Sequence, residues 1–449
     1  MKSPLKAYLP FYRRNLKVAF PVMFTQLGAS LVGLFDSIMV GRYATTDLAA
    51  VSFSNAIFFT IMVFAMGTLM SVTPLVGYEV GAQSETSRIS HLFHSGVVLT
   101  IFLSISMVML LGAVIPFLDY FGQDPDVIAV ARPYYILIVI SIVPFLFFCL
   151  IKQFLEGLGN TFVAMVISFV MNGLNILLNW IFIFGHCGFA PMGATGAGIA
   201  TLISRTLMPL CFLAVLYYRS SWRIYLRHLN QNVQQLMRGV RQLWETGLPI
   251  GCQTLLETVT FTLSFIFIGW LNKESLAAQQ VANQIADLTF MLALGIGSAT
   301  TIRVSHQLGK GDLYAVRMAS NASIHLVLLM NSIGAIMMIS LSSYIPLLFT
   351  RDQAVIEIAQ TLILFAGFFQ YADGLQTVGA AMLRGITDVK VPMLIAFIAY
   401  ILVALPIGLL CTFTWEMGAK GMWIGFISGL SVAAILFHIR FRQQLAKKG

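Results

Sequence analysis

Twelve apolar runs, each about 20 residues long, recur along this chain of 449 residues. A run of that length crosses the hydrocarbon core of a bilayer as an α-helix, because each residue rises about 1.5 Å and the core is about 30 Å thick. With 58% hydrophobic and 10% charged residues and a mean hydropathy of +0.85, the chain has too little polar surface to cover a soluble globule. The sequence therefore predicts an all-α polytopic membrane protein, with helices near 17–40, 53–77, 92–117, 133–152, 161–184, 195–218, 244–270, 280–303, 319–347, 356–380, 391–413 and 420–439.

Basic residues are distributed unevenly between the segments that separate these runs. An even number of spans places both termini on one side, and most Lys and Arg fall on that side. Arg205 falls inside a run, and the opposite side has Arg42, Arg132, Lys273, Arg351 and Lys420. By the positive-inside rule, both termini are expected in the cytoplasm. The formal net charge of +9 then has a topological cause, so we do not expect nucleic-acid binding.

An internal repeat relates the two halves of the chain. At a shift of 228 positions the matching pairs include Pro21 and Pro249, Gly41 and Gly269, Asp124 and Asp352, and Gly157 and Gly385. Each half has six runs, so the halves share one orientation and a pseudo-twofold axis along the membrane normal is expected. We predict two pseudo-symmetric six-helix lobes, residues 1–218 and 244–449, around a central cavity. Duplication that serves stability alone is the alternative.

The join between the lobes, residues 219–243, has the pattern of an amphipathic helix. Its apolar positions recur every three to four residues, with Arg on other faces: Tyr225, Leu229, Val233, Leu236 and Val240. We predict a linker helix on the cytoplasmic membrane surface.

A single carboxylate, Asp36, lies in the first run, PVMFTQLGASLVGLFDSIMVG. An Asp at the centre of a membrane helix costs about 2.5–3.5 kcal/mol, so it marks a functional site unless it lies near the interface and reaches water. In the fifth run Asn172, Asn175 and Asn179 share one helical face, and Asn179 lies at about the depth of Asp36. We predict a hydrated cation or proton site of Asp36, Asn175 and Asn179, with Asn172 as a helper. The alternative is helix association through Asn hydrogen bonds, about 1 kcal/mol each.

The second half has a different pair of acids near the predicted midplane, Glu257 and Asp373. Burial and like charge both disfavour ionisation of two neighbouring carboxylates unless a cation lies between them. We therefore predict that Glu257 and Asp373 bind Na⁺ or H⁺, with both carboxylates as ligands if the ion is Na⁺. Asp287 is a possible helper, although a salt bridge or a wet crevice explains it as well. Arg205 is either a counter-charge or a side chain that reaches the interface.

Other chemistries lack their motifs. Gly309-Lys310 is without the remaining residues of a phosphate-binding loop, and neither His-Glu-x-x-His nor Gly-x-Ser-x-Gly occurs. The five cysteines are scattered singly and are expected to pack as small apolar residues. We predict a protein that is not an enzyme and has no cofactor beyond a coupling ion.

Four motifs together resemble a known family. They are Phe35-Asp36-Ser37-Ile38-Met39-Val40-Gly41, the segment from Asn175 to Gly185, Met192-Gly193-Ala194-Thr195-Gly196-Ala197-Gly198, and Leu383-Arg384-Gly385. They are similar to motifs of the multidrug and toxic compound extrusion (MATE) transporters, over nearly the whole chain. The resemblance implies twelve helices in two six-helix lobes with a V-shaped cavity. In the bacterial NorM-type branch the site acids match Asp36, Glu257 and Asp373, and the Asn pair matches Asn175 and Asn179.

The resemblance also implies an activity. It is secondary active efflux, in which cationic or amphipathic drugs leave the cell against Na⁺ or H⁺ by alternating access. Asn179 stands where some relatives have Asp, so a two-acid proton site is not implied in the first half, and Glu257 with Asp373 favours Na⁺. We expect a monomer in the bacterial inner membrane, with small-molecule drugs and membrane lipid as partners. The alternative is a lipid-linked oligosaccharide flippase, whose cavity would need several basic residues.

Overall fold

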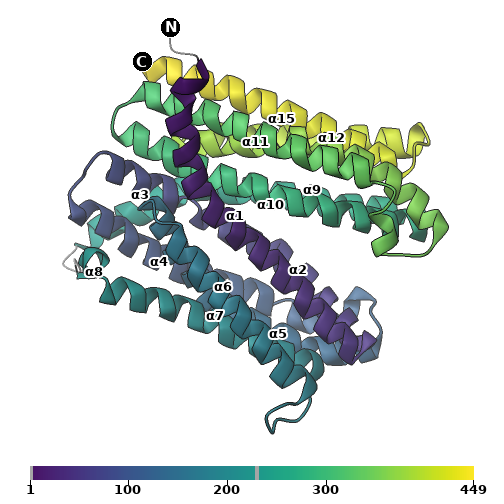
Figure 1. The fold of residues 1–449 in the computed structure, drawn as a ribbon. Coiled ribbons are helices and arrows are strands. Elements are labelled where there is room, and N and C mark those ends of the chain that lie inside the picture. The colour runs from purple at the N-terminus through teal and green to yellow at the C-terminus, as the bar shows by residue number, and fades with distance from the viewer. Residues whose placement is uncertain (1–3, 228–231, 449) are drawn as a thin grey trace. The chain divides into compact units, whose positions relative to one another are not determined.

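The computed structural model describes residues 4–227 and 232–448, and Figure 1 shows its helices in order. The first half contains α1 (Pro4–Tyr43), α2 (Thr45–Leu69), α3 (Val72–Gly81), α4 (Thr86–Gly112), the 3₁₀ turn η1 (Ile115–Phe121), α5 (Pro125–Gly157), α6 (Phe162–Phe184), α7 (Gly193–Tyr218) and α8 (Ser220–Arg227). The second half contains α9 (Val233–Gly269), α10 (Lys273–Gly309), α11 (Leu313–Leu341), the 3₁₀ turn η2 (Pro346–Leu348), α12 (Gln353–Gly385), α13 (Lys390–Phe397), the π-helix η3 (Ile398–Ala404), α14 (Leu405–Leu409), the π-helix η4 (Leu410–Thr414) and α15 (Ala419–Lys448).

Twelve helical segments among the described residues are long and apolar enough to cross a membrane. They coincide with the twelve predicted runs, so the predicted class and helix count are confirmed. Two spans contain more than one element: α2 with α3 over Thr45–Gly81, and α13 to η4 over Lys390–Thr414. Most helices extend past the predicted ends, because polar residues continue a helix beyond the apolar stretch that a hydropathy pattern detects.

The span Lys390–Thr414 is irregular around Pro406. Proline has no backbone N–H, and its ring clashes with the carbonyl of the preceding turn. Wider π-helical turns flank it, at Ile398–Ala404 and Leu410–Thr414. Tyr400 therefore lies in a widened turn, and such turns are frequent at functional sites.

The helices pack in two compact units, each with its own core. We call residues 27–251 unit N, and residues 1–26 together with 252–449 unit C. These units differ from the predicted lobes, because residues 1–26 pack in unit C and residues 244–251 in unit N. The predicted division of the chain into lobes 1–218 and 244–449, which would move as two bodies during transport, therefore stays a prediction.

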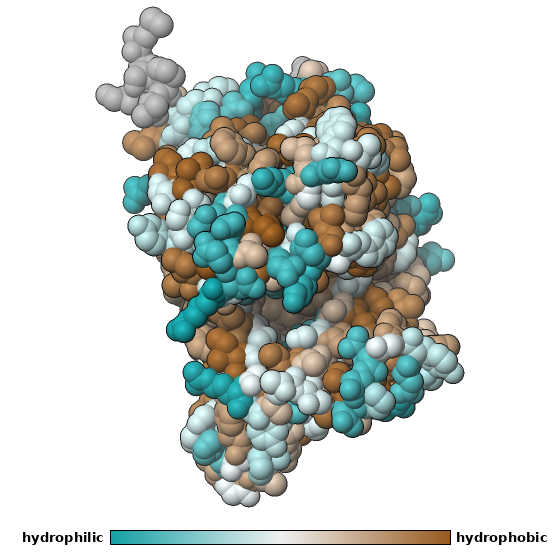
Figure 2. Space-filling model, turned by 90° about the vertical axis from the view of Figure 1, so that its right-hand side faces the viewer, coloured by the Kyte–Doolittle hydropathy of each residue, from teal (hydrophilic) through white to brown (hydrophobic). Residues whose placement is uncertain are grey.

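Buried aromatic side chains form much of each core. Phe58, Phe154 and Phe212 are almost completely buried in unit N, and Trp423 and Phe437 are in unit C. Many other Leu, Ile and Phe side chains are exposed, and Figure 2 shows apolar residues, in brown, interspersed with polar ones, in teal, on one face. Apolar surface of this extent is expected where lipid covers the protein.

The repeat extends to individual hydrogen bonds. In unit N the hydroxyl of Thr73 donates to the backbone carbonyl of Gln153, at 2.9 Å. In unit C, 228 positions later, Thr301 donates to the carbonyl of Ala381, at 3.0 Å. The same contact therefore joins the second and fourth spans of each half.

Close helix packing repeats at the same register. A Cβ on Gly157 would lie 2.8 Å from the Cβ of Val76, and a Cβ on Gly385 would lie 2.7 Å from the Cβ of Val304. Both glycines are thus required by the approach of the neighbouring helix, which explains why they match in the sequence repeat.

The repeated Met-Gly-Ala motif begins a helix in each half. Gly193 and Gly418 have φ of 53° and 62°, a left-handed conformation that favours glycine. Asp47 on α2 accepts a hydrogen bond from the backbone N–H of Ala194, at 2.5 Å. This carboxylate satisfies one of the N–H groups left unpaired at the start of α7.

Residues 219–243 do not form the single amphipathic helix that their spacing suggests. Helix α8 ends at Arg227, Asn232 is not helical, and α9 runs unbroken from Val233 into the seventh span. Leu229 lies outside the described residues. The segment packs on α4 instead, where Ser90 donates to the carbonyl of Tyr225 at 2.8 Å.

Candidate functional sites

In unit N the structure brings Asp36 and two of the asparagines together. Asn179 Nδ2 donates to Asp36 Oδ1 at 2.5 Å and to Asn175 Oδ1 at 3.3 Å. Asn175 and Asn179 are buried, and Asp36 is half-buried. Asn179 Oδ1 has no hydrogen-bond partner among the described residues. The cluster therefore contains a carboxylate that can bind a proton. The carboxylate and the unpaired amide oxygen of Asn179 are also oxygen ligands of the kind that bind a hard cation.

Asn172 lies two turns along α6 from Asn179 and packs elsewhere. Its Nδ2 is 3.3 Å from the position that a Cβ on Gly28 would occupy, so it contacts α1 about two turns before Asp36. The structure places it beside the same two helices, but no described hydrogen bond joins it to the Asp36 cluster.

Arg205 on α7 supplies a positive charge to this cluster. It interacts electrostatically with Asp36 and donates to Ser141 Oγ at 2.9 Å. The rings of Phe58 and Phe145 lie 5.2 and 4.8 Å from its guanidinium carbon, close enough for cation–π contacts. Of the two roles that the sequence left open, the structure supports a counter-charge, and Asp36 is its acid.

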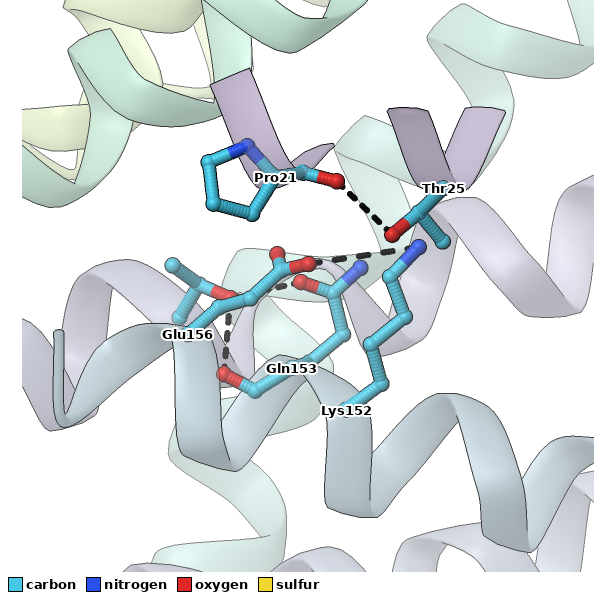
Figure 3. Close-up of polar contacts among 6 residues, drawn as sticks. Pro21, Thr25, Lys152, Gln153 and Glu156 are labelled. Carbon is cyan, nitrogen blue, oxygen red and sulfur yellow. Dashed lines mark hydrogen bonds and ion pairs between the residues drawn. The ribbon is translucent and has the colours of Figure 1, made fainter. Parts of the chain in front are cut away.

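A second polar group in unit N lies at the end of α5 (Figure 3). Glu156 is 3% exposed, and its Oε1 lies 3.9 Å from Lys152 Nζ. The side chain of Gln153 accepts a hydrogen bond from Thr73, at 2.6 Å. The sequence analysis did not single out these residues, although a Lys and a Glu four apart in an apolar helix are a visible signal.

In unit C, Glu257 on α9 is held by two side chains. Gln376 Nε2 donates to Glu257 Oε1 at 3.0 Å and to the hydroxyl of Tyr400 at 2.7 Å. The Tyr400 hydroxyl also hydrogen-bonds Glu257. Three elements, α9, α12 and η3, thus position one carboxylate.

Asp373 lies one turn before Gln376 on α12 and is 4% exposed. It interacts electrostatically with Glu257 and with Asp287 on α10, whose side chain is exposed. Among the described residues we find no hydrogen bond to the Asp373 carboxylate. Unit C therefore brings together the three acids that the sequence indicated in the second half.

Arg384 is the basic residue of this group. It lies near the end of α12, in the Leu383-Arg384-Gly385 motif, and interacts electrostatically with Glu257 and Tyr400. The group contains one guanidinium and three carboxylates, so it has an excess of negative charge when all are ionised. Two carboxylates with the Tyr400 and Gln376 oxygens are hard ligands of the kind that bind alkali and alkaline-earth cations. Within residues 4–227 and 232–448, no group of three or more His, Cys, Asp or Glu side chains is placed to hold a metal ion.

Four further residues were missed: Tyr400 and Gln376 beside Glu257, and Tyr134, which interacts electrostatically with Asp36, with its partner Asn55. Gln376 lies three residues after Asp373, so helical spacing could have found it. Tyr400 lies one and a half turns before Pro406, and a proline inside a span was the available signal. Tyr134 donates to Asn55 Oδ1 at 3.2 Å, a contact that no local pattern predicts.

These features define a helical membrane protein with two related six-span halves, each with a buried acid among polar side chains. The MatE family profile matches residues 21–181 and 249–410, that is, both halves of the repeat. The chain therefore belongs to the MatE family, as the resemblance in its motifs implied.

Relatives cover nearly the whole chain. It is 31% identical over 440 residues to the "Probable multidrug resistance protein NorM" of Brucella suis, covering 96% of this chain and 93% of that protein. It is 35% identical over 431 residues to the "Multidrug resistance protein NorM" of Vibrio vulnificus, covering 95% and 94%. The chain thus belongs with the bacterial proteins named NorM within this family.

Solved structures agree with the fold. The structure matches "eukaryotic MATE transporter AtDTX14" with a TM-score of 0.87 at 19% identity, covering 98% of both chains. It matches "MATE in the straight conformation" with a TM-score of 0.87 at 20% identity, covering 98% and 97%. The predicted MATE fold is therefore confirmed.

Proposed function

We propose that this transporter exports cationic or amphipathic organic compounds in exchange for Na⁺ or H⁺, and that Glu257 and Asp373 bind the coupling cation. The observation that carries this proposal is the excess of acids in the group formed by Glu257, Asp373, Asp287 and Arg384. Asp373 interacts with two other carboxylates and accepts no described hydrogen bond, so a cation is the partner that would stabilise its ionised form. A cationic drug and a coupling cation would both bind to these carboxylates and cannot bind at the same time. Binding of one therefore favours release of the other.

The Asp36 cluster supplies a second acid for coupling. Arg205 already offsets the charge of Asp36, so this cluster has less need of a metal cation than the unit C group. Protonation of Asp36 would weaken its hydrogen bond with Asn179, which would lose its charge assistance, and would leave Arg205 without the Asp36 counter-charge. We therefore assign Asp36, Asn175 and Asn179 to a site whose protonation state changes during transport, with Asn172 in a supporting role and Asp287 as a helper of Asp373.

The driving force sets a limit on accumulation. One positive charge that enters down 100 mV supplies about 2.3 kcal/mol, which corresponds to roughly a fifty-fold gradient. If one monovalent drug cation leaves for each monovalent ion that enters, the electrical contributions cancel. Only the chemical gradient of the ion then drives export.

The flippase alternative receives no support from the relatives or from the site. A pyrophosphate substrate needs a cluster of basic side chains, whereas Arg384 is outnumbered by the acids of its own group, Glu257, Asp373 and Asp287. We retain the transporter as the proposal, working as a monomer by alternating access, with both termini in the cytoplasm.

Ethidium efflux from proteoliposomes tests the function. Na⁺ and pH gradients are imposed separately, in the absence of other ions that the protein could exchange. We expect ethidium movement against its gradient with at least one of the two ions, and none with matched ions on both sides. Absence of ethidium flux under either gradient, together with flux of a lipid-linked sugar, would overturn the proposal in favour of the flippase.

A further inference from the structure

Two guanidinium nitrogens of the half-buried Arg303 on α10 have no described hydrogen-bond partner. Its Nε and Nη2 atoms are buried and form no hydrogen bond with any described residue. Neither Arg303 nor Arg14 takes part in an ion pair among the described residues. Leaving charged donors unpaired in a buried place costs free energy, so such a group commonly marks a ligand that completes it.

A second positive charge faces Arg303 within unit C. Arg14 on α1 interacts electrostatically with it, and the two like charges repel. Packing explains why they meet: a Cβ on Gly295 would lie 2.9 Å from the backbone nitrogen of Met23, so α1 and α10 touch there. The first and eighth spans run in opposite directions, so Arg14 and Arg303 lie about 13.5 and 12 Å from that contact, on the same side of it. The fold thus holds two guanidinium groups at one depth, without an acid to compensate them.

The surroundings of this pair indicate what the ligand is. Arg303 lies six residues before the end of its span, on the predicted cytoplasmic side and at headgroup depth. Arg13 and Lys17 on α1 are exposed and add positive charge, while Leu16 and Phe20 between Arg14 and Met23 are 37% and 57% exposed. An anion with attached hydrocarbon chains suits both features, because its phosphate meets the basic groups and its chains meet the apolar ones.

The geometry points to a binding site for the phosphate of an anionic membrane lipid, formed by Arg303 and Arg14 in unit C. Arg303 donates from Nε and Nη2, the fork that binds two phosphate oxygens at once. Arg14 adds charge at the outer edge. The lipid neutralises the repulsion between the two groups and thereby stabilises the packing of α1 on α10. This site is separate from the acids proposed for ion exchange and does not depend on that proposal.

Native mass spectrometry of the delipidated full-length protein in detergent tests the site. The probes are dioleoyl phosphatidylglycerol, dioleoyl phosphatidylcholine and inorganic phosphate. We expect tighter binding of phosphatidylglycerol than of phosphatidylcholine. Arg303→Gln should weaken the tightest phosphatidylglycerol site by about tenfold or more, and Arg14→Gln by about fivefold. Arg317→Gln, which removes an exposed charge on α11, is the matched control and should change nothing.

Arg303→Lys keeps the charge but loses the fork, so it should bind phosphatidylglycerol better than Arg303→Gln and worse than the wild type. If Arg303→Gln does not fold, Arg303→Lys and Arg14→Gln carry the test. Wild-type affinity in these variants, or equal affinity for phosphatidylcholine, would overturn the proposal. Displacement of phosphatidylglycerol by an equal concentration of inorganic phosphate would overturn the lipid assignment in favour of a free phosphate ion. Because binding is measured without ion gradients, failure here leaves the proposed exchange untouched.

Discussion

The hydroxyl of Tyr400 offers a sharp test of the unit C site, because Tyr400→Phe removes one oxygen atom and little else. That oxygen hydrogen-bonds Glu257 and accepts from Gln376 Nε2 at 2.7 Å. The phenyl ring keeps the packing of a side chain that is 0% exposed. The substitution therefore weakens the polar surroundings of Glu257 without opening a cavity.

The size of the effect follows from the charge on Glu257. A hydrogen bond to a charged group contributes about 1.5–3 kcal/mol, which corresponds to about 10- to 150-fold in an equilibrium constant. Gln376 keeps its own bond to Glu257, at 3.0 Å, and partly compensates for the loss. We therefore expect the lower end of this range, a shift of about tenfold in the cation concentration at half-maximal efflux. The Na⁺ concentration should rise, because Na⁺ loses the Tyr400 oxygen as a ligand, and the H⁺ concentration should fall, because one hydrogen bond fewer stabilises the ionised carboxylate.

The assay is ethidium efflux from proteoliposomes, titrated separately with Na⁺ and with H⁺. Tyr135→Phe is the matched control, because Tyr135 is equally buried and its hydroxyl donates only to the carbonyl of Leu111, in unit N. The control should keep the wild-type cation dependence. A Tyr400→Phe protein that folds, binds drug and has the wild-type cation dependence would refute the assignment of Glu257 to the cation site.

Three further predictions concern the acid in unit N, the topology and helix packing. Asp36→Asn should abolish drug efflux while the protein remains inserted and folded, since the side chain keeps its size and loses only its titratable charge; wild-type resistance in a drug-susceptibility assay would exclude Asp36 from the mechanism. A cysteine that replaces Lys273 should react with membrane-impermeant reagents from outside, and one that replaces Lys448 should react only from the cytoplasm. Labelling of both cysteines from the same side would contradict the predicted topology. Gly385→Ala should lower the free energy of unfolding by about 1–3 kcal/mol and so lower the thermal midpoint, because the new Cβ would meet Val304. Gly112→Ala is the control, because the space there is open, and it should leave the thermal midpoint unchanged or slightly raised. Equal midpoints for the two variants would contradict the packing argument.

The number of membrane spans and the repeat that relates the two halves were predictable from the sequence. Apolar runs identify spans because a bilayer demands about 20 apolar residues from each helix. The pairs Gly157 with Gly385 and Thr73 with Thr301 lie 228 positions apart because both halves repeat the same close helix contact. The repeat in the sequence therefore reports shared helix contacts as well as shared topology.

The details of packing were not predictable, because they depend on contacts between distant segments. The division of α1 and α9 between the two units follows from which neighbours each end meets, and hydropathy does not encode this. The pattern in residues 219–243 suggested one helix on the membrane surface. In the structure this segment belongs to two helices, α8 and the start of α9, with Trp222 buried and Tyr225 hydrogen-bonded to Ser90 on α4.

The candidate sites show the same contrast. Asp36, Glu257 and Asp373 were visible because a charge in an apolar run is costly and rare. Tyr400 was not visible, because a tyrosine in a membrane span is usual and only the widened turn η3 brings its hydroxyl to Glu257. The interaction of Arg384 with Glu257 was not predictable, because its position near the end of α12 gave no sign of where its long side chain lies.

The central claim, that Glu257 and Asp373 bind the coupling cation as one unit, is tested most directly by a double-mutant cycle of Glu257→Gln and Asp373→Asn. The measurement is ion-driven drug efflux from proteoliposomes, with equilibrium drug binding in detergent recorded for each protein. Once one carboxylate is lost the other contributes little, so each single variant should lose nearly as much ion-driven efflux as the double variant, while some drug binding remains. Additive losses in the cycle, or ion-driven efflux that persists in the double variant, would contradict the paired site and move the coupling to Asp36 with Asn175 and Asn179.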